Sequence, residues 1–86
     1  MSFEVVYSHQ VTKFLKKSED VLVKRFLHKI DELREKPVSH DTKTIESSEK
    51  LFRVRVGDYR ILYEVDYKNT VIGIVKIDKR ASVYQA

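Results

Sequence analysis

Apolar residues recur along the chain with two different periods, and the change of period divides the sequence into a helical part and a strand part. Residues Phe3–Tyr7 are β-branched and aromatic, which is typical of a short strand. Ser8 has the side chain of a helix N-cap, and Val11, Phe14 and Leu15 follow it at helical spacing. These residues predict a strand followed by a first helix.

A second helix is predicted after Ser18, which we expect to be its N-cap, with Glu19 and Asp20 placed favourably at the positive end of the helix dipole. An apolar stripe runs along this helix and consists of Leu22, Phe26, Ile30 and Leu33, widened by Val23 and Leu27. Charged residues fall outside the stripe and are expected to face water: Lys24, Arg25, Asp31, Glu32 and Glu35. Pro37 disfavours helical geometry at the residue before it and should end the helix.

After a polar stretch at Pro37–Lys50, which we expect to form a loop, the pattern changes to strict alternation. Three strands with tight connections are predicted, at Leu51–Val56, Tyr59–Val65 and Val71–Ile77. The order of an N-terminal strand, a helical hairpin and a three-stranded antiparallel meander predicts an α+β fold with the helices packed on one face of the sheet. With 86 residues, the chain is expected to form a single domain over residues 1–86.

The turn between the first two strands of the meander predicts their register. Gly57-Asp58 fits a two-residue type II′ turn, because glycine readily takes the positive φ of the first position. That turn sets Arg55 opposite Arg60 in the antiparallel pair. Directly opposed residues share a face, so one face should be core, formed by Phe52, Val54, Val56, Tyr59, Ile61 and Tyr63. The other face should present Arg53, Arg55 and Arg60 together.

This arginine face allows two interpretations. Like charges set opposite each other destabilise a sheet, so the arginines either splay into solvent and pair with Glu64 and Asp58, or form a site for a polyanion. The rigid fork of arginine matches the geometry of phosphate. Because a rule of local stability is broken without an evident compensation in the sequence, we favour the functional interpretation.

Composition limits the other kinds of chemistry. The chain has no cysteine, which excludes disulfides and thiolate metal sites. No apolar run approaches the roughly 20 residues of a membrane helix, and the N-terminus lacks the pattern of a signal peptide, so we expect a cytoplasmic protein. The net charge is only +4, but four of the six arginines lie within residues 51–86.

The run LFRVRVGDYRILYEV at Leu51–Val65, followed by KIDKRASVY at Lys76–Tyr84, resembles the RelE/ParE toxin superfamily and, within it, the RelE-type messenger-RNA interferases. The helical hairpin before this run agrees with the family in order and length. The resemblance implies a RelE-like fold and the toxin of a type II toxin–antitoxin system, which cuts messenger RNA in the ribosomal A site. The expected partners are the ribosome with its messenger RNA and a cognate acidic antitoxin; no cofactor or metal is implied.

Site residues follow from the same resemblance. Two strand lysines of the family's best-known member fall on Arg53 and Arg55, and the arginine after the hairpin falls on Arg60. The arginine of the final Lys-Arg pair falls on Arg80. The C-terminal tyrosine falls on Tyr84 with a gap of two residues. These five residues are the expected catalytic set.

Their chemistry can be stated without a metal. The ribose 2′-hydroxyl attacks the adjacent phosphate and gives a 2′,3′-cyclic phosphate and a 5′-hydroxyl. Arg55 and Arg60 suit stabilisation of the anionic phosphorane, and Arg80 suits assistance to the leaving group. Tyr84 can stack on a base, orient the 2′-hydroxyl or act as the general base. Arginine stays protonated in proteins and is a poor base, whereas the pKa of a lysine can be lowered by its surroundings. We therefore expect a metal-independent endoribonuclease that is weak without the ribosome.

Several alternatives stay open at this point. Lys76 and Lys79 either bind RNA at the rim of the site or are ordinary surface lysines, and Glu64 is either a base or a carboxylate that holds an arginine in place. The histidines lack metal-ligand spacing and do not form an evident acid–base pair: His9, His28 and His40. The same fold also supports a ParE-like inhibitor of DNA gyrase without nuclease chemistry, or an inactive member that binds only RNA or antitoxin.

Overall fold

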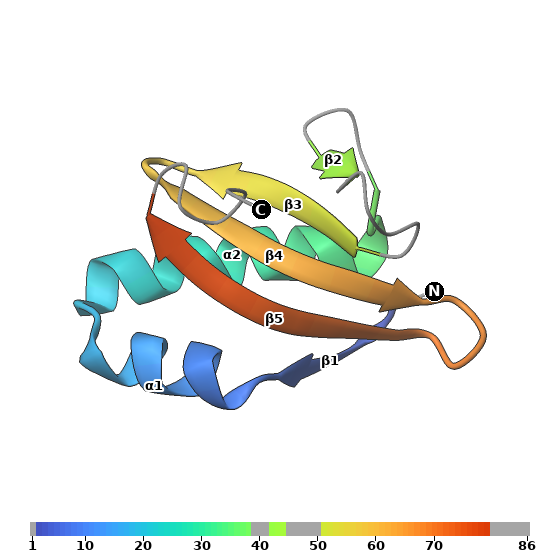
Figure 1. Ribbon diagram of the computed structural model, residues 1–86, viewed down its shortest axis with the longest axis horizontal. Coiled ribbons are helices and arrows are strands. Elements are labelled where there is room, and N and C mark those ends of the chain that lie inside the picture. Colours follow the sequence, from blue (N-terminus) through green and yellow to red (C-terminus); the bar gives the residue numbers. More distant parts are fainter. Residues whose placement is uncertain (1, 39–41, 45–50, 80–86) are drawn as a thin grey trace.

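The computed structural model describes residues 2–38, 42–44 and 51–79. Its elements in chain order are β1 (Glu4–Tyr7), α1 (His9–Lys17), α2 (Asp20–Glu35), β2 (Thr42–Thr44), β3 (Leu51–Val56), β4 (Tyr59–Asp66) and β5 (Val71–Lys79). The strands form one five-stranded sheet in the order β1-β5-β4-β3-β2, in which β1 runs parallel to β5 and all other neighbours are antiparallel (Figure 1). The predicted α+β fold, with strand, helical hairpin and meander in that order, is confirmed.

The polar stretch at residues 37–50 contains one element that the sequence did not reveal. β2 pairs antiparallel with β3, from Thr42 opposite Val54 to Thr44 opposite Phe52, and extends the sheet by an edge strand. The expectation of a loop is therefore wrong at Thr42–Thr44. Three residues are too short a run to show a period-two pattern, so this strand is defined by its neighbour rather than by its own sequence.

The two helices begin differently. Ser8 is the N-cap of α1 as predicted, and its Oγ accepts a hydrogen bond from Val11 N at 3.2 Å. The prediction that Ser18 caps α2 is wrong. Its hydroxyl turns back along α1 and donates to Phe14 O at 2.8 Å, while Glu19 occupies the N-cap of α2 without a side-chain bond. Serine can bond the carbonyl four residues earlier instead of the next helix, and here that local bond wins.

The core lies between the helices and one face of the sheet, with α2 passing behind the strands in Figure 1. The helices contribute Val11, Phe26, Ile30 and Leu33, and the strands contribute Phe52, Val54, Val56, Ile61, Tyr63, Val65, Ile72, Ile74 and Ile77. The predicted stripe of α2 is confirmed except at Leu27, which is 40% exposed. α2 ends at Glu35, before Pro37, as predicted. None of the helices in the described ranges is long and apolar enough to cross a membrane.

Candidate functional site

The β3–β4 hairpin has the predicted register, with Arg55 opposite Arg60 and Arg53 opposite Leu62. Its turn depends on Gly57, which has a φ of +58°. A Cβ at this position would lie 2.8 Å from Nη2 of Arg25 on α2, so glycine is also needed for the close approach of that side chain. The predicted core face of the hairpin is confirmed, since its residues are buried or half-buried against the helices.

Among the described residues, no helix packs on the opposite face of the sheet, the helix-free face, and side chains lie there in rows across the strands. One row holds Arg55, Arg60 and Asp78, and the next holds Lys43, Arg53, Leu62 and Lys76. We call the cations that β3, β4 and β5 contribute to these two rows the arginine face: Arg53, Arg55, Arg60 and Lys76. Arg55 is exposed and donates from Nε to Gly57 O at 3.3 Å, while Arg53 and Arg60 are half-buried.

Asp78 supplies a compensation that the sequence argument missed. It stands directly opposite Arg60, on the side away from Arg55, and its Oδ2 lies 3.9 Å from Lys76 Nζ. The sequence did not reveal that Asp78 lies opposite Arg60, because no short turn predicts the register of β5. The two-residue turn between β3 and β4 does predict their register. With four cations and one carboxylate on β3, β4 and β5, the two rows still carry a net positive charge, so Asp78 reduces the like-charge repulsion without neutralising the face.

The two rim lysines fall on opposite sides of the sheet. Lys76 shares a row with Arg53, and its side chain is 45% exposed. Lys79 pairs with Tyr59, whose ring belongs to the core side, and Lys79 Nζ lies 5.7 Å from the centre of that ring. The structure therefore brings Lys76 to the arginines and does not bring Lys79 there. Arg80 and Tyr84 lie outside the described residues; β5 ends at Lys79, directly before Arg80 in the chain.

Other candidate acids and bases lie away from the arginine pair. Glu64 is four residues from Arg60 along β4, a distance of about 13 Å at the rise of an antiparallel strand, and it is a diagonal neighbour of Arg53. His9 and His28 are exposed on the helices, where His28 Nε2 lies 3.2 Å from Glu32 Oε2. His40 lies outside the described residues. Within the described ranges, Glu64 is thus a neighbour of one arginine rather than of the opposed pair.

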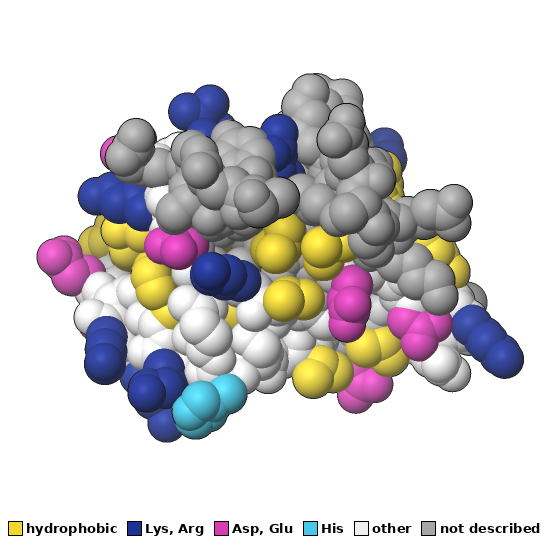
Figure 2. All heavy atoms as spheres, viewed as in Figure 1, with side chains coloured by type: hydrophobic (Ala, Val, Ile, Leu, Met, Phe, Trp, Pro, Cys, Tyr) yellow, Lys and Arg dark blue, Asp and Glu magenta, His cyan; other side chains and the backbone are white. Residues whose placement is uncertain are grey.

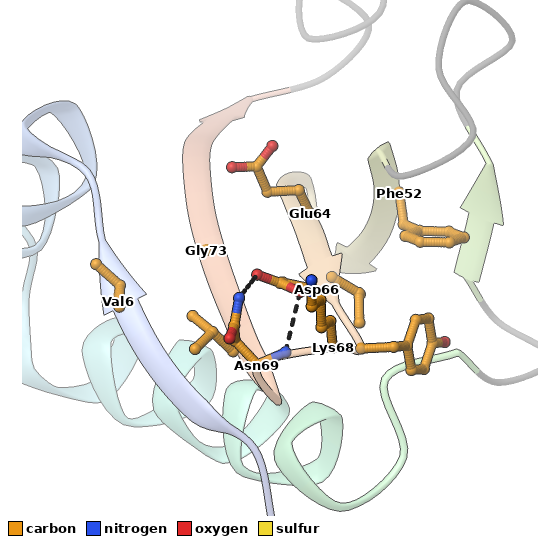
Figure 3. A pocket seen from close by; sticks show the side chains of 10 residues that line it. Val6, Phe52, Glu64, Asp66, Lys68, Asn69 and Gly73 are labelled. Carbon is orange, nitrogen blue, oxygen red and sulfur yellow. Dashed lines mark hydrogen bonds between the residues drawn. The ribbon is translucent and has the colours of Figure 1, made fainter.

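The far end of the helix-free face differs from the arginine face in charge. An open groove of about 870 Å³ lies there, lined by Val6, Phe52, Glu64, Val65, Asp66, Tyr67, Lys68, Asn69, Val71 and Gly73 (Figure 3). The side chain of Glu64 lies over Gly73, in the space that a side chain at position 73 would occupy. A Cβ on Gly73 would lie 3.4 Å from Glu64 Cγ. In the view of Figure 2, hydrophobic side chains are exposed between charged ones on the side where β4 and β5 lie in front of α2. Glu64 and Asp66 would repel an anionic ligand, so a polyanion should favour the hairpin end.

The chemistry available on the arginine face is anion binding and stabilisation of developing negative charge. Arg53, Arg55 and Arg60 come from two adjacent strands joined by a two-residue turn, so their backbones are held in a rigid relative position. Preorganised cations need little reorganisation when charge develops on a bound phosphate. Guanidinium groups do not accept a proton near neutral pH, so the arginines cannot act as the general base.

Comparison with known proteins gives a consistent relationship over almost the whole chain. A family model described as the ParE toxin of the type II toxin–antitoxin system parDE matches residues 5–84. "Putative toxin RelE1" of Methanocaldococcus jannaschii is 32% identical over 88 residues, which span 99% of this chain and 98% of that protein. The structure is also similar to a chain of the archaeal RelE–RelB complex from Pyrococcus horikoshii OT3. The TM-score is 0.83 at 35% identity, and the match covers 94% of this chain and 98% of that one.

The fold is also shared with a more distant structure. The isolated RelE toxin of E. coli has a TM-score of 0.81 at 17% identity, with 96% of this chain and 92% of that chain covered. At that identity the likeness concerns the fold alone. The P. horikoshii structure is a complex with RelB, so in that protein the toxin chain is bound to its antitoxin.

Proposed function

Since this chain is a RelE-family toxin of a type II toxin–antitoxin system and belongs to the RelE/ParE superfamily, we propose that it is a ribosome-dependent endoribonuclease that cleaves messenger RNA. The reaction is attack of a ribose 2′-hydroxyl on the adjacent phosphate, which breaks the bond to the 5′-oxygen of the next nucleotide. The products are a 2′,3′-cyclic phosphate and a 5′-hydroxyl. Cleavage of messenger RNA in this way stops translation.

The observation that carries this proposal is the convergence of Arg53, Arg55 and Arg60 on the helix-free face of the sheet. Arg55 and Arg60 are directly opposed, so two guanidinium groups can approach one phosphate from two strands. Bidentate contacts from arginine to phosphate are among the stronger charge-assisted hydrogen bonds. A sheet selected only for stability would not place these two cations opposite each other.

The residues have different roles in this proposal. Arg55 and Arg60 stabilise the negative charge of the phosphorane, and Arg53 with Lys76 holds the neighbouring phosphates of the strand. Arg80 assists the departure of the 5′-oxygen. Tyr84, or a group supplied by the ribosomal complex, takes the proton of the 2′-hydroxyl, because the arginines remain protonated.

The proposed partners are an acidic antitoxin and the ribosome. A negatively charged antitoxin segment that folds on binding would cover the arginine face and block access of RNA. Its charge complements Arg55, the most exposed arginine of the face. Binding and inhibition would then have the same cause.

The test is cleavage of messenger RNA in a translating extract, followed by mapping of the new 5′ ends. Wild-type protein should cut within the codon in the A site, and cutting should stop when ribosomes are removed. Lys13→Ala removes an exposed charge from α1, away from the arginine face, and is the matched control for charge loss. Intact messenger RNA at toxin concentrations that stop growth would refute the proposal.

A second candidate is a ParE-like inhibitor of DNA gyrase, which is favoured by the description of the matching family model. Gyrase inhibition requires binding to a protein and does not require convergent phosphate ligands, so the arginine face supports the nuclease instead. The two functions are separated by a DNA supercoiling assay with purified gyrase. Inhibition of supercoiling without cleavage of RNA would establish the second candidate, and RNA binding without either activity would indicate an inactive member.

A further inference from the structure

Strand β5 does not alternate regularly between the two faces of the sheet. Its buried residues are Ile72, Ile74 and Ile77, separated first by two positions and then by three. The pairing with β4 changes at the same place, because Tyr63 lies opposite Ile74 while Leu62 lies opposite Lys76. Val75 is thus the extra residue of a β-bulge.

The bulge determines which side chains of β5 reach the arginine face. In a regular strand continuing from Ile74, Val75 would lie opposite Leu62, and Lys76 would lie opposite the buried Ile61. Insertion of Val75 shifts the remaining residues by one position, so Lys76 shares the row of Leu62 and Asp78 shares the row of Arg60. Both charged groups therefore reach the arginine face only because of the bulge.

Two side chains at the start of α1 hold β5 on either side of the bulge. β1 covers the edge of β5 only as far as Tyr7 opposite Ile74. Beyond that point, Ser8 Oγ donates to Val75 O at 2.7 Å. Gln10 then acts as a strand would, since its Nε2 donates to Ile77 O and its Oε1 accepts from Ile77 N, both at 3.2 Å.

Helix capping alone does not require these bonds. The cap of α1 is complete when Ser8 Oγ accepts from Val11 N, and a helix cap has no use for a hydroxyl donated to another strand. The paired bonds of Gln10 to Ile77 likewise add nothing to α1, because Gln10 lies in its first turn and its side chain points to β5. Both side chains are directed at the strand segment that carries Lys76 and Asp78.

We propose that Ser8 and Gln10 are positioning residues of the RNA site, which hold the bulged segment of β5 so that Lys76 stays in the row of Arg53 and diagonal to Arg60. This inference rests on the proposed function, since it assigns to Lys76 a contact with RNA phosphate. Ser8 and Gln10 touch neither RNA nor the arginines and act through Lys76. RNA binding should therefore depend on Ser8 and Gln10 only while Lys76 is present.

The experiment is a double-mutant cycle on RNA binding, measured by fluorescence anisotropy with a single-stranded RNA made uncleavable by 2′-deoxy substitution. Lys76→Ala should weaken binding on the order of fivefold, as for one exposed charge contact, and lower the salt dependence by about 0.7 in log K against log salt. Ser8→Ala and Gln10→Met should each produce part or all of that loss. Either substitution combined with Lys76→Ala should bind no more weakly than Lys76→Ala alone.

Two controls separate positioning from loss of the fold. Ser8→Thr keeps the hydroxyl and should restore binding, while Thr12→Ala removes another hydroxyl of α1, one that donates to Ser8 O and not to β5, and should bind as wild type. Amide exchange at Ile77 should accelerate in Gln10→Met, which reports the release of β5 directly. If Ser8→Ala is not folded at the assay temperature, the double-mutant cycle is measured with Gln10→Met and Lys76→Ala alone.

The outcomes distinguish this inference from the proposed function. Additive losses in the cycle, or wild-type affinity and salt dependence in both Ser8→Ala and Gln10→Met, would show that these residues do not act through Lys76, while leaving RNA binding by the arginine face intact. A wild-type protein that neither binds nor cleaves RNA would instead overturn the proposed function, and the inference with it.

Discussion

Arg60 lies in the middle of the arginine face, and its replacement by alanine should strongly slow cleavage while the protein stays folded. It is opposed by Arg55 on one side and Asp78 on the other. Alanine relieves the repulsion of Arg55 and removes the attraction of Asp78, so the two electrostatic effects oppose each other. Cross-strand pairs of opposite charge contribute roughly 0.2–1 kcal/mol. We therefore expect the free energy of unfolding to change by less than about 1 kcal/mol, or roughly 4–8 °C in Tm at most.

The effect on the reaction should be much larger. If Arg60 faces the charge that develops on the phosphorane, its loss should slow cleavage by about 10²–10³, equivalent to about 2.7–4 kcal/mol. Arg60→Lys keeps the charge but loses the bidentate fork, so we expect a loss on the order of tenfold, between wild type and alanine. A change in stability of about 1 kcal/mol cannot cause a 10²-fold loss in a protein that remains folded at the assay temperature.

The assay is single-turnover cleavage on ribosomes programmed with a defined messenger RNA, with thermal unfolding measured on the same preparations. Growth arrest at matched expression gives the cellular counterpart. Lys13→Ala, which removes an exposed charge on α1, should cleave at the wild-type rate. Full toxicity of Arg60→Ala at equal expression, or a cleavage rate within a few-fold of wild type, would show that the arginine face is not the site.

Substitutions at three further positions test the fold and the remaining site residue. Ile61→Asp should unfold the protein, because Ile61 is 0% exposed. An unpaired buried charge costs several kcal/mol, on the order of the stability of a small domain. A soluble Ile61→Asp protein with cooperative unfolding would overturn the hairpin register. Tyr63→Phe removes the hydroxyl that donates to Pro37 O and should lower the free energy of unfolding by about 1–3 kcal/mol in denaturant titrations, with no separate effect on cleavage by the folded protein. Tyr84→Phe should slow single-turnover cleavage by roughly 10²–10⁴ if Tyr84 orients or activates the 2′-hydroxyl. Near-normal cleavage by Tyr84→Phe but not by Tyr84→Ala would instead indicate stacking on a base. Normal cleavage rates in both variants would remove Tyr84 from the site.

The part of the site that could be predicted from the sequence is the part defined by a local turn. Gly57 fixes the β3–β4 turn through its positive φ, and a two-residue turn leaves one register for the strands it joins. From that register, the shared face of Arg53, Arg55 and Arg60 follows by alternation alone. The buried and half-buried residues of the opposite face confirm the same reasoning.

The features that were missed depend on contacts between distant segments. The bulge at Val75 is specified by the spacing of Ile72, Ile74 and Ile77 together with bonds from Ser8, which is 67 residues away. β2 is defined by its pairing with β3. In each case the local sequence is compatible with more than one structure, and tertiary contacts select among them.

The proposed site separates charge stabilisation, which the rigid sheet provides, from proton transfer, which needs a group outside the three arginines. Arg53, Arg55 and Arg60 lie on paired strands of one sheet, which suits charge stabilisation because cations held in place need not reorganise during the reaction. Proton transfer has the opposite requirement, a group whose pKa lies near the working pH, and arginine cannot meet it. A protein with this face should therefore bind and polarise phosphate on its own but cleave slowly until another group is brought to the 2′-hydroxyl. That separation gives a physical reason for the proposed dependence on the ribosome, where the substrate is held in a geometry that the isolated toxin does not impose.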